Sequence, residues 1–417
     1  MSDTPNTGPK CPFPHFGALH EPFEHEGMYN FFSDVRPKAR VFYSPEIDCW
    51  VVTHHADIKP VMEDSTGFSA TLATRPICPW PQSMRDYLDS RNFQNESVQV
   101  ACDPPKHTRI RHIAARFMNI RQLSSYEDQL RALVRGYLEK LEGAEEVDLV
   151  DAIFYEFPAQ AVFLLIGVTD FDPRKIKEWG NLRINSIFGR PSEQELLDAA
   201  KDIADFWDFS AELVQSRIDN PIDDYASALL KLRDGDDEKL TMNELRNLVF
   251  GLQLAGHETT TNAAGNLFYA LMSHPDQWQK LVDDPSLVPN AVEGGLRFAS
   301  SVVAWRRIAT TEVEVAGKRF PEGTKFLLAL VSGNRDEDVF SDGETFDVTR
   351  ANPREHIAFG HGLHKCLGAP LARLELRILL EELTSRYPNM RLVPGQDISW
   401  IKTLSFQGPK SLRVTLA

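Results

Sequence analysis

The stretch FGHGLHKCLG, residues 359–368, places one cysteine among glycines and histidines directly before a helical segment. Pro370 suits a first helical turn, and apolar residues then repeat at helical spacing, at Leu371, Leu374, Ile378 and Leu379. Unpaired amides at a helix N-terminus favour negative charge, so we expect the pKa of the Cys366 thiol to lie below its ordinary value. Such a thiolate could be a nucleophile or a metal ligand, and an inert buried thiol is the third alternative.

A second unusual stretch lies in the apolar run 247–274, which is typical of a buried central helix. Its middle, residues 255–261, contains Gly256, an acid and three threonines where Ala or Leu would serve a plain helix. A threonine that donates to the carbonyl one turn earlier can open a helix and leave room for a small ligand. His257 and Glu258 begin like a zinc-protease HExxH motif, but Thr261 replaces its second histidine. A threonine-rich core helix without function is the other alternative.

Phe359-Gly360-x-Gly362-x-His364-x-Cys366-x-Gly368 resembles, position for position, the haem-ligand signature of the cytochrome P450 family. In that family the cysteine thiolate is the proximal ligand of haem iron and favours O–O cleavage. The resemblance implies haem b (heme, iron protoporphyrin IX) ligated by Cys366. It also places Phe359, Gly360 and Gly368 beside the porphyrin.

The threonine-rich stretch resembles the oxygen-activation helix of the same family, in which an acid followed by threonine lies over the distal face of the haem. The resemblance implies that Thr259 hydrogen-bonds dioxygen and that Glu258 helps to relay protons to it, a task for a positioned acid. Ala255 would lie against the haem.

Four further residues match the family's partners of the two haem propionates, which need cationic or hydrogen-bonding groups. His107 and Arg111 lie one helical turn apart and so face the same way. Arg307 matches the arginine of the strand beside the haem, and His356 precedes the cysteine loop. Arg306 would point to the opposite face of that strand.

One segment departs from the family pattern. Family members usually carry ExxR on the helix before the Arg307 strand, and here Gly294 stands where the glutamate is expected. Glu293 lies four residues before Arg297, a spacing that can also form an ion pair, although two adjacent glycines weaken the helix by roughly 1 kcal/mol each. By resemblance Arg350 is the third member of this bracing network. We therefore expect weaker bracing and weaker haem retention.

Composition excludes several classes of protein. The 417 residues carry a formal net charge of −15, which makes nucleic acid an improbable partner. No apolar run approaches the length of a membrane span, and the polar N-terminus lacks the pattern of a signal peptide. The five cysteines are few and scattered, so we expect a cytoplasmic protein without disulfides.

The chain is expected to form one mainly α domain over residues 1–417 with a minor β region. We predict a hairpin at 41–53, helices over 105–296, strands at 311–332, and short strands again from Met390. Residues 1–30 are expected to be partly irregular, and 69–101 to be an irregular segment that controls substrate access. The resemblance implies a triangular helical prism, with the haem between the central helix and the cysteine-ligand helix.

The function implied is a haem-thiolate monooxygenase that inserts one oxygen atom from O₂ into a small or medium apolar substrate, aromatic compounds included. By resemblance the pocket walls include Trp80, Leu252, Val302, Val303 and Phe406. The alternatives are a peroxide-driven peroxygenase and a haem-based sensor or electron carrier.

Electrons are expected from a separate protein, because the sequence has no flavin, nicotinamide or iron–sulfur fingerprint, although it is similar to haem domains of reductase-fused bacterial members. By family analogy the donor would be a ferredoxin or an FMN/iron–sulfur reductase. The protein is expected to be a monomer. A basic patch for docking the electron donor could form on its cysteine side from Arg109, Arg116, Lys365 and Arg373.

Overall fold

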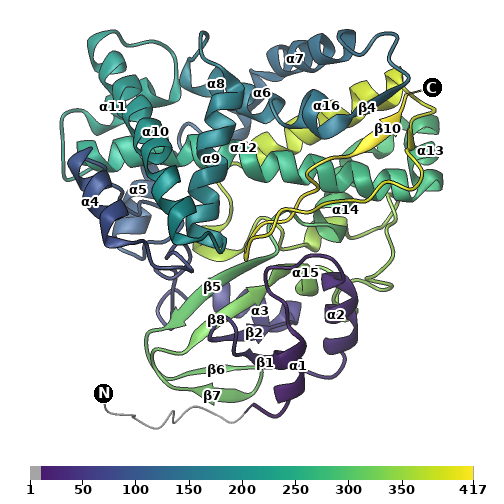
Figure 1. The fold of residues 1–417 in the computed structure, drawn as a ribbon, viewed down its shortest axis with the longest axis horizontal. Coiled ribbons are helices and arrows are strands. Elements are labelled where there is room, and N and C mark those ends of the chain that lie inside the picture. Colours follow the sequence, from purple (N-terminus) through teal and green to yellow (C-terminus); the bar gives the residue numbers. More distant parts are fainter. Residues whose placement is uncertain (1–10, 417) are drawn as a thin grey trace.

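A computed structural model describes residues 11–416 of the chain. Helices fill one part of the molecule and a small sheet fills the other, next to the N-terminal helices (Figure 1). The expected fold, mainly α with a minor β region, is confirmed. Among residues 11–416, none of the helices combines the length and apolarity needed to cross a bilayer.

The main sheet has five strands in the order β1-β2-β8-β5-β3. The predicted N-terminal hairpin is confirmed: β1 (Val41–Ser44) pairs antiparallel with β2 (Cys49–Val52). Parallel pairing then joins β2 to β8 (Lys325–Ala329), which pairs antiparallel with β5 (Ala304–Ala309). The short β3 (Phe68–Ser69) closes the sheet beside β5. This pairing positions the strand that carries Arg307.

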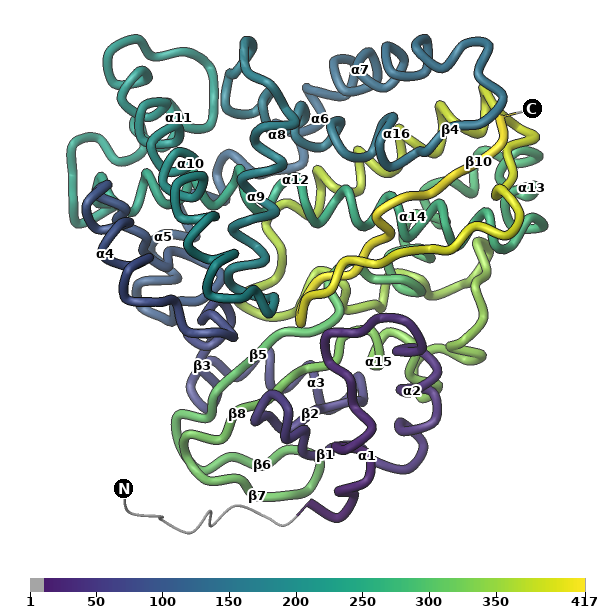
Figure 2. The backbone as a smooth tube through the Cα atoms, viewed as in Figure 1, coloured from purple at the N-terminus to yellow at the C-terminus, as the bar shows by residue number. Residues whose placement is uncertain are grey.

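Two smaller sheets complete the β region. The strands β6 (Val313–Val315) and β7 (Lys318–Phe320) form a hairpin just before β8, as expected for 311–332. In the other sheet β10 (Arg413–Thr415) lies between β4 (Glu146–Asp148) and β9 (Arg391–Leu392). The C-terminal segment runs from this sheet back to the main sheet (Figure 2), where Phe406 bridges to Val302.

The longest helix, α12 (Met242–Ser273), crosses the helical part of the molecule (Figure 1). A capping box between Thr241 and Glu244 starts it, since each side chain satisfies a free amide of the other. Apolar residues on all sides let other helices cover it, and its neighbours are α8 (Phe157–Ile166), α9 (Pro173–Phe188), α10 (Glu193–Asp219), α14 (Val288–Phe298) and α16 (Ala369–Arg386).

The remaining α-helices surround this core or lie against the sheet: α1 (Pro14–Leu19), α2 (Met28–Val35), α3 (His55–Glu63), α4 (Gln82–Ser90), α5 (Lys106–Ala114), α6 (Ile120–Ser124), α7 (Glu127–Glu139), α11 (Tyr225–Arg233), α13 (Pro275–Asp283) and α15 (Leu330–Gly333). A π-helix, Val150–Phe154, precedes α8.

The expectation of an irregular segment over 69–101 is wrong for its middle, which forms α4. Met84 and Leu88, four residues apart, pack against Leu196 and Ala200 of α10, so two apolar residues suffice to fix this helix. Within 1–30, Pro14–Leu19 is helical, and residues 1–10 lie outside the described part.

Candidate active site

The cysteine loop is a tight turn that delivers Cys366 to the start of α16. The Cys366 amide donates to the Phe359 carbonyl at 2.7 Å. Gly360 and Gly362 have φ of 68° and 66°, which L side chains rarely adopt, and a Cβ at Gly362 would lie 2.6 Å from the Met62 carbonyl oxygen. The glycines of the motif therefore serve the loop backbone itself.

Cys366 keeps exposed surface, yet burial raises the pKa of its thiol, with the Gly368 and Ala369 amides and the Arg111 charge opposing. A pKa lowered by the helix N-terminus was expected, and for the free thiol this prediction is wrong because desolvation outweighs the amides. A metal cation at the sulfur reverses this balance, since a coordinating thiol is deprotonated outright.

One face of α12 is accessible at the threonine-rich stretch. Ala255 is exposed in the middle of an otherwise covered helix, and Leu252 and Thr259 on the same face are half-buried. Thr259 Oγ1 donates to the Ala255 carbonyl at 3.0 Å, which confirms the expected hydrogen bond to the preceding turn. The helix nevertheless runs unbroken from Met242 to Ser273.

The neighbouring acid, Glu258, faces away from Thr259 toward α9. Lys177 Nζ on α9 donates to Glu258 Oε2 at 2.6 Å and to Thr261 Oγ1 at 3.0 Å, and the Lys177 side chain is fully buried. Burial lowers the pKa of Lys177, and the Glu258 charge opposes this. Sequence reasoning missed Lys177, because no local signal distinguishes it from the other basic residues of that segment.

A cluster of histidine and arginine side chains, in part buried, adjoins the cysteine loop. The ring of His107 lies 4.2 Å from that of His364, and neither ring nitrogen of His107 has a hydrogen-bond partner in the described chain. Burial, together with Arg307 and His107, lowers the pKa of His364 to about 4. Arg111 donates to the Lys365 carbonyl. Burial lowers the pKa of Arg111, and the charge of an ionised Cys366 opposes this.

This cluster fits a haem better than it fits an empty core. Arg307 is buried, and burial lowers its pKa to about 10, while Arg307 Nη1 donates only to the Arg306 carbonyl at 2.9 Å. Buried polar groups are normally satisfied, and two carboxylates would satisfy His107 and Arg307 together. Within residues 11–416 no group of three or more His, Cys, Asp and Glu could hold a metal, so an iron here would need a porphyrin for its other ligands.

His356, expected beside a propionate, is engaged elsewhere. Its Nε2 donates to Glu293 Oε2 at 2.9 Å and its Nδ1 accepts from the Ala358 amide at 3.2 Å, which leaves no ring nitrogen for a propionate. Arg373 joins the same carboxylate through two hydrogen bonds, at 2.7 and 3.0 Å, and stacks over Phe359. We therefore remove His356 from the haem-binding set.

The expected ion pair between Glu293 and Arg297 is absent from the described network. Arg297 instead donates to three carbonyls, those of Asn334, Gly343 and Thr345. Burial, with the like charges of Arg350 and Arg335, lowers the pKa of Arg297 to about 9. A Cβ at Gly294 would meet only ordinary contacts, the nearest being 3.7 Å away.

An apolar cluster brings together α9, the loop before β5 and the C-terminal turn. Val302 and Phe406, which were predicted as pocket walls, both belong to it, and their role as walls stays a prediction. The cluster adds residues that sequence reasoning missed: Ile184, Ile187, Phe188, Leu254, Trp305 and Ile401. Trp80 is half-buried and its Nε1 donates to the Ser186 carbonyl at 3.0 Å, which fixes the indole against α9.

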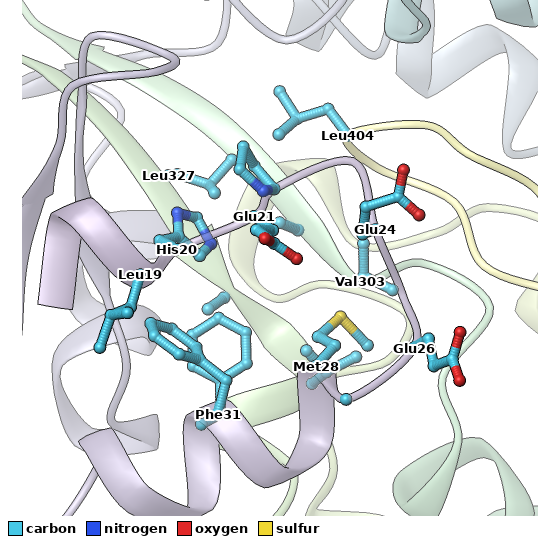
Figure 3. A pocket seen from close by; sticks show the side chains of 16 residues that line it. Leu19, His20, Glu21, Glu24, Glu26, Met28, Phe31, Val303, Leu327 and Leu404 are labelled. Atoms are coloured by element: carbon cyan, nitrogen blue, oxygen red, sulfur yellow. The ribbon is translucent and has the colours of Figure 1, made fainter.

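Val303 does not belong with these walls. It is buried in a separate cluster and lines a hollow of about 220 Å³ near the N-terminal helices, together with Met28 and Leu404 (Figure 3). Val302 and Val303 point to opposite faces because they are consecutive in an extended segment, so the two could not share one pocket. The prediction for Val303 is wrong.

Comparison with known proteins agrees with this geometry. A statistical model of the family described as Cytochrome P450 matches residues 176–410. Cytochrome P450 CYP107DY1 of Priestia megaterium is 32% identical, over 88% of this chain and 89% of that protein. The solved structure of cytochrome P450 CREJ in complex with (4-ethylphenyl) dihydrogen phosphate has a TM-score of 0.92 and 34% identity, covering 96% of this chain and 100% of that one.

A second similar structure is longer than this chain. An intact type IV self-sufficient cytochrome P450 monooxygenase has a TM-score of 0.92 and 31% identity, and the match covers 98% of this chain and 55% of that one. These findings confirm the resemblance that the sequence showed and the fold that it implied.

We predict that Glu293→Gln lowers stability in a pH-dependent way. Burial raises the pKa of Glu293, but hydrogen bonds from His356 and Arg373 outweigh it and lower the pKa from 4.5 to about 2. A carboxyl group whose pKa is lower in the folded state than in the unfolded state stabilises the fold above pH 4.5, and this contribution is lost as the pH falls toward 2. The variant should therefore lose about 3 kcal/mol at pH 7 and progressively less below pH 4.5.

Urea unfolding of both proteins at a series of pH values measures this difference. Glu146→Gln is the control, because the Glu146–Arg413 pair is exposed and should contribute less than about 1 kcal/mol. A wild-type advantage over Glu293→Gln that stays constant down to pH 2 would contradict the assignment.

We predict that Gly294→Glu stabilises the protein. A carboxylate at 294 lies one turn before the buried Arg297, where it supplies a direct ion-pair partner, and it also removes a helix glycine. The gain should be about 2 kcal/mol, of which Gly294→Ala should recover only the helix-propensity part, about 1 kcal/mol. Thermal unfolding and haem content of the three proteins decide this; equal stability of the Ala and Glu variants would show that Arg297 needs no counter-charge.

Proposed function

The chain belongs to the cytochrome P450 family and is a haem monooxygenase, and we propose that Cys366 is the residue through which it holds the iron. The observation that carries this proposal is the Cys366 side chain, which keeps exposed surface just before α16. Near it lie the buried His107, whose ring nitrogens have no partner in the described chain, and the buried Arg307, which donates to one carbonyl. Members of the family bind haem through a cysteine thiolate.

His107, Arg111 and Arg307 would hold the propionates, with His364 as an added neighbour. Phe359, Gly360 and Gly368 would lie on the sulfur side, where a Cβ at Gly368 would be only 3.9 Å from Cys366 Sγ. Ala255 would lie on the opposite side, because it is the exposed residue of central α12. When bound, the haem supplies the activation of dioxygen by two electrons, with one oxygen atom entering the substrate and the other leaving as water.

The protein's own part is to position the substrate and to supply protons. The Thr259 hydroxyl lies on the accessible face of α12 and is held by the Ala255 carbonyl, so it can offer a hydrogen bond there. Glu258 is the proton source that we propose, and its carboxylate must leave Lys177 to reach that face. Release from a buried ion pair makes proton delivery dependent on a side-chain movement.

We propose a small or medium apolar substrate with aromatic compounds included. The walls that support this are Val302, Trp305, Phe188 and Phe406, with Leu252 and Trp80 at the margins, and the aromatic rings of Phe188 and Phe406 meet edge to face at 4.9 Å. A similar protein has been solved with (4-ethylphenyl) dihydrogen phosphate, a compound of this size with an aromatic ring.

Members of this family use dioxygen, a substrate and redox partners, and we propose that a ferredoxin or an FMN/iron–sulfur reductase delivers the electrons in the cytoplasm. Lys365 and Arg116 are exposed and remain as docking residues. Arg109 and Arg373 are weaker choices, because Arg109 pairs with Glu244 and Arg373 pairs with Glu293. Turnover with NADH and partner proteins, compared with hydrogen peroxide alone, separates this function from a peroxygenase; binding of haem without turnover in either assay would indicate the sensor or electron carrier.

We predict that Cys366→Ser abolishes thiolate ligation. The reduced wild-type protein under carbon monoxide should show the Soret band characteristic of thiolate-bound haem, and the variant should lose it, because a serine oxygen is a poor thiolate substitute. Cys11→Ser is the control, since Cys11 accepts a hydrogen bond from the Tyr43 amide far along the chain. An unchanged spectrum of the Cys366 variant would refute the proposed ligand.

We predict that Glu258→Gln lowers turnover with dioxygen about 100-fold, the size expected for loss of a positioned acid. Substrate-induced spectral shifts should stay unchanged, because Glu258 is buried against Lys177 and away from the Ala255 face. The matched control is Glu244→Gln on the same helix, also buried and also paired, with Arg109. Equal turnover of the two variants would exclude Glu258 as the proton source.

A further inference from the structure

Arg183 on α9 is a buried cation without a polar partner. Its exposed fraction is 5%, and its Nε and Nη1 are enclosed with no hydrogen-bond acceptor in the described chain. Neither a hydrogen bond nor a salt bridge of its side chain occurs among residues 11–416. Burial lowers the pKa of Arg183 to about 10, and burial is the cause that accounts for the shift.

Two other buried arginines of the molecule do have hydrogen-bond acceptors. Arg297 donates to three backbone carbonyls, and Arg306 donates to the carbonyls of Ala73 and Arg75. Burying an unpaired charge is costly, and the fold gives both of these buried guanidinium groups backbone acceptors while Arg183 has none. The bare group is the mark of a site whose partner comes from outside the chain.

The surroundings of Arg183 are aromatic. Its guanidinium carbon lies 4.9 Å from the centre of the Trp80 ring and 5.5 Å from that of Phe93. Such contacts attract a cation but leave its in-plane N–H groups unsatisfied. Trp80 is itself held in place by the Ser186 carbonyl, so the aromatic wall is rigid.

The contact with Trp80, one of the proposed walls, places Arg183 at the margin of the proposed substrate space. One turn earlier, Gly180 packs so closely on α12 that a Cβ there would lie 2.6 Å from His257 Cε1 and 3.8 Å from Leu254 Cδ1. The residue after Arg183, Ile184, belongs to the apolar cluster with Phe406 and Val302. Arg183 thus precedes the residues of α9 that belong to that cluster. Its guanidinium lies over Phe93, and Phe93 in turn contacts Phe250 of α12.

We propose that Arg183 binds an oxyanion carried by the substrate, a carboxylate or a phosphate monoester attached to an apolar or aromatic body. A guanidinium is a planar fork that matches either group with two parallel hydrogen bonds. The apolar body would then extend along Ile184 and Phe406 toward Ala255. This inference rests on the proposed function, because it names the substrate class of the same pocket, and it makes anion recognition the determinant of binding in a protein of net charge −15.

The test compares three ligands on the haem-loaded protein: 4-ethylphenyl phosphate, 4-ethylbenzoate and the neutral 4-ethylbenzamide. Dissociation constants come from the substrate-induced spectral shift and, independently, from titration calorimetry. At least one of the two anions should bind ten- to a hundredfold more tightly than the amide, and the stronger anion identifies the group that Arg183 accepts. If neither anion binds more tightly than the amide, the proposal is overturned.

Two variants assign the preference to one side chain. Arg183→Met should abolish the anion preference and leave amide binding unchanged, whereas Arg190→Met should keep the preference. Arg190 follows α9, is exposed and pairs with Glu46, so its variant removes the same charge outside the pocket. A preference that survives in Arg183→Met overturns the proposal, and if that variant does not fold, the wild-type comparison with the amide still decides.

The outcome also separates this inference from the proposed function. Binding of the amide with a thiolate-type carbon monoxide spectrum, but no anion preference, would leave the monooxygenase standing and remove only the anion site. Failure of every compound to shift the spectrum, with loss of the thiolate signature, would remove both.

Discussion

The structure depends on the cost of enclosing charged and polar groups that the chain itself does not satisfy. Cys366 itself keeps exposed surface. Near it lie His107, whose two ring nitrogens have no partner in the described chain, and the buried Arg307, which donates only to a backbone carbonyl. Each would be unfavourable in a finished hydrophobic core. Together they are what a dianionic, iron-containing haem requires: carboxylate partners at one edge and a sulfur ligand below.

The central helix divides its chemistry between two faces. Consecutive helical residues point about 100° apart, so Glu258 and Thr259 cannot both face the same space. Thr259 lies with Ala255 on the accessible face, while Glu258 lies with Thr261 against α9, where Lys177 neutralises it. Glu258 is therefore held in a buried ion pair with Lys177, beside the accessible face of α12 and not on it. A carboxylate held in this way reaches the accessible face only after a movement of α9 or of its own side chain.

Sequence reasoning succeeded where local pattern dictates structure and failed where distant segments meet. The cysteine loop follows from its glycines, and the α12 run and the first hairpin follow from apolar periodicity, so their positions could be predicted. The partner of Glu258 lies 81 residues away, and no local signal distinguishes Lys177 from its basic neighbours. Val303 failed for a different reason, because a one-residue difference in an extended segment decides which of two clusters a side chain joins. Helix α4 was missed because two buried residues are too few to make a visible period.

The proximal side shows how a missing residue can be replaced from another helix. With Gly294 in place of the expected glutamate, the preceding Glu293 turns toward α16 and takes two hydrogen bonds from Arg373 and one from His356. This joins the helix before the β5 strand directly to the helix that begins at the cysteine loop. Arg373 also stacks on Phe359 at 4.6 Å, so the same carboxylate fixes the residue at the start of the loop. Bracing thus acts on the sulfur side through Glu293, while Arg297 holds backbone carbonyls and makes no direct ion pair within the described chain. The bracing network has therefore changed its partners. Arg297 is the residue that loses an ion pair by this change, and the contacts to the cysteine loop are kept.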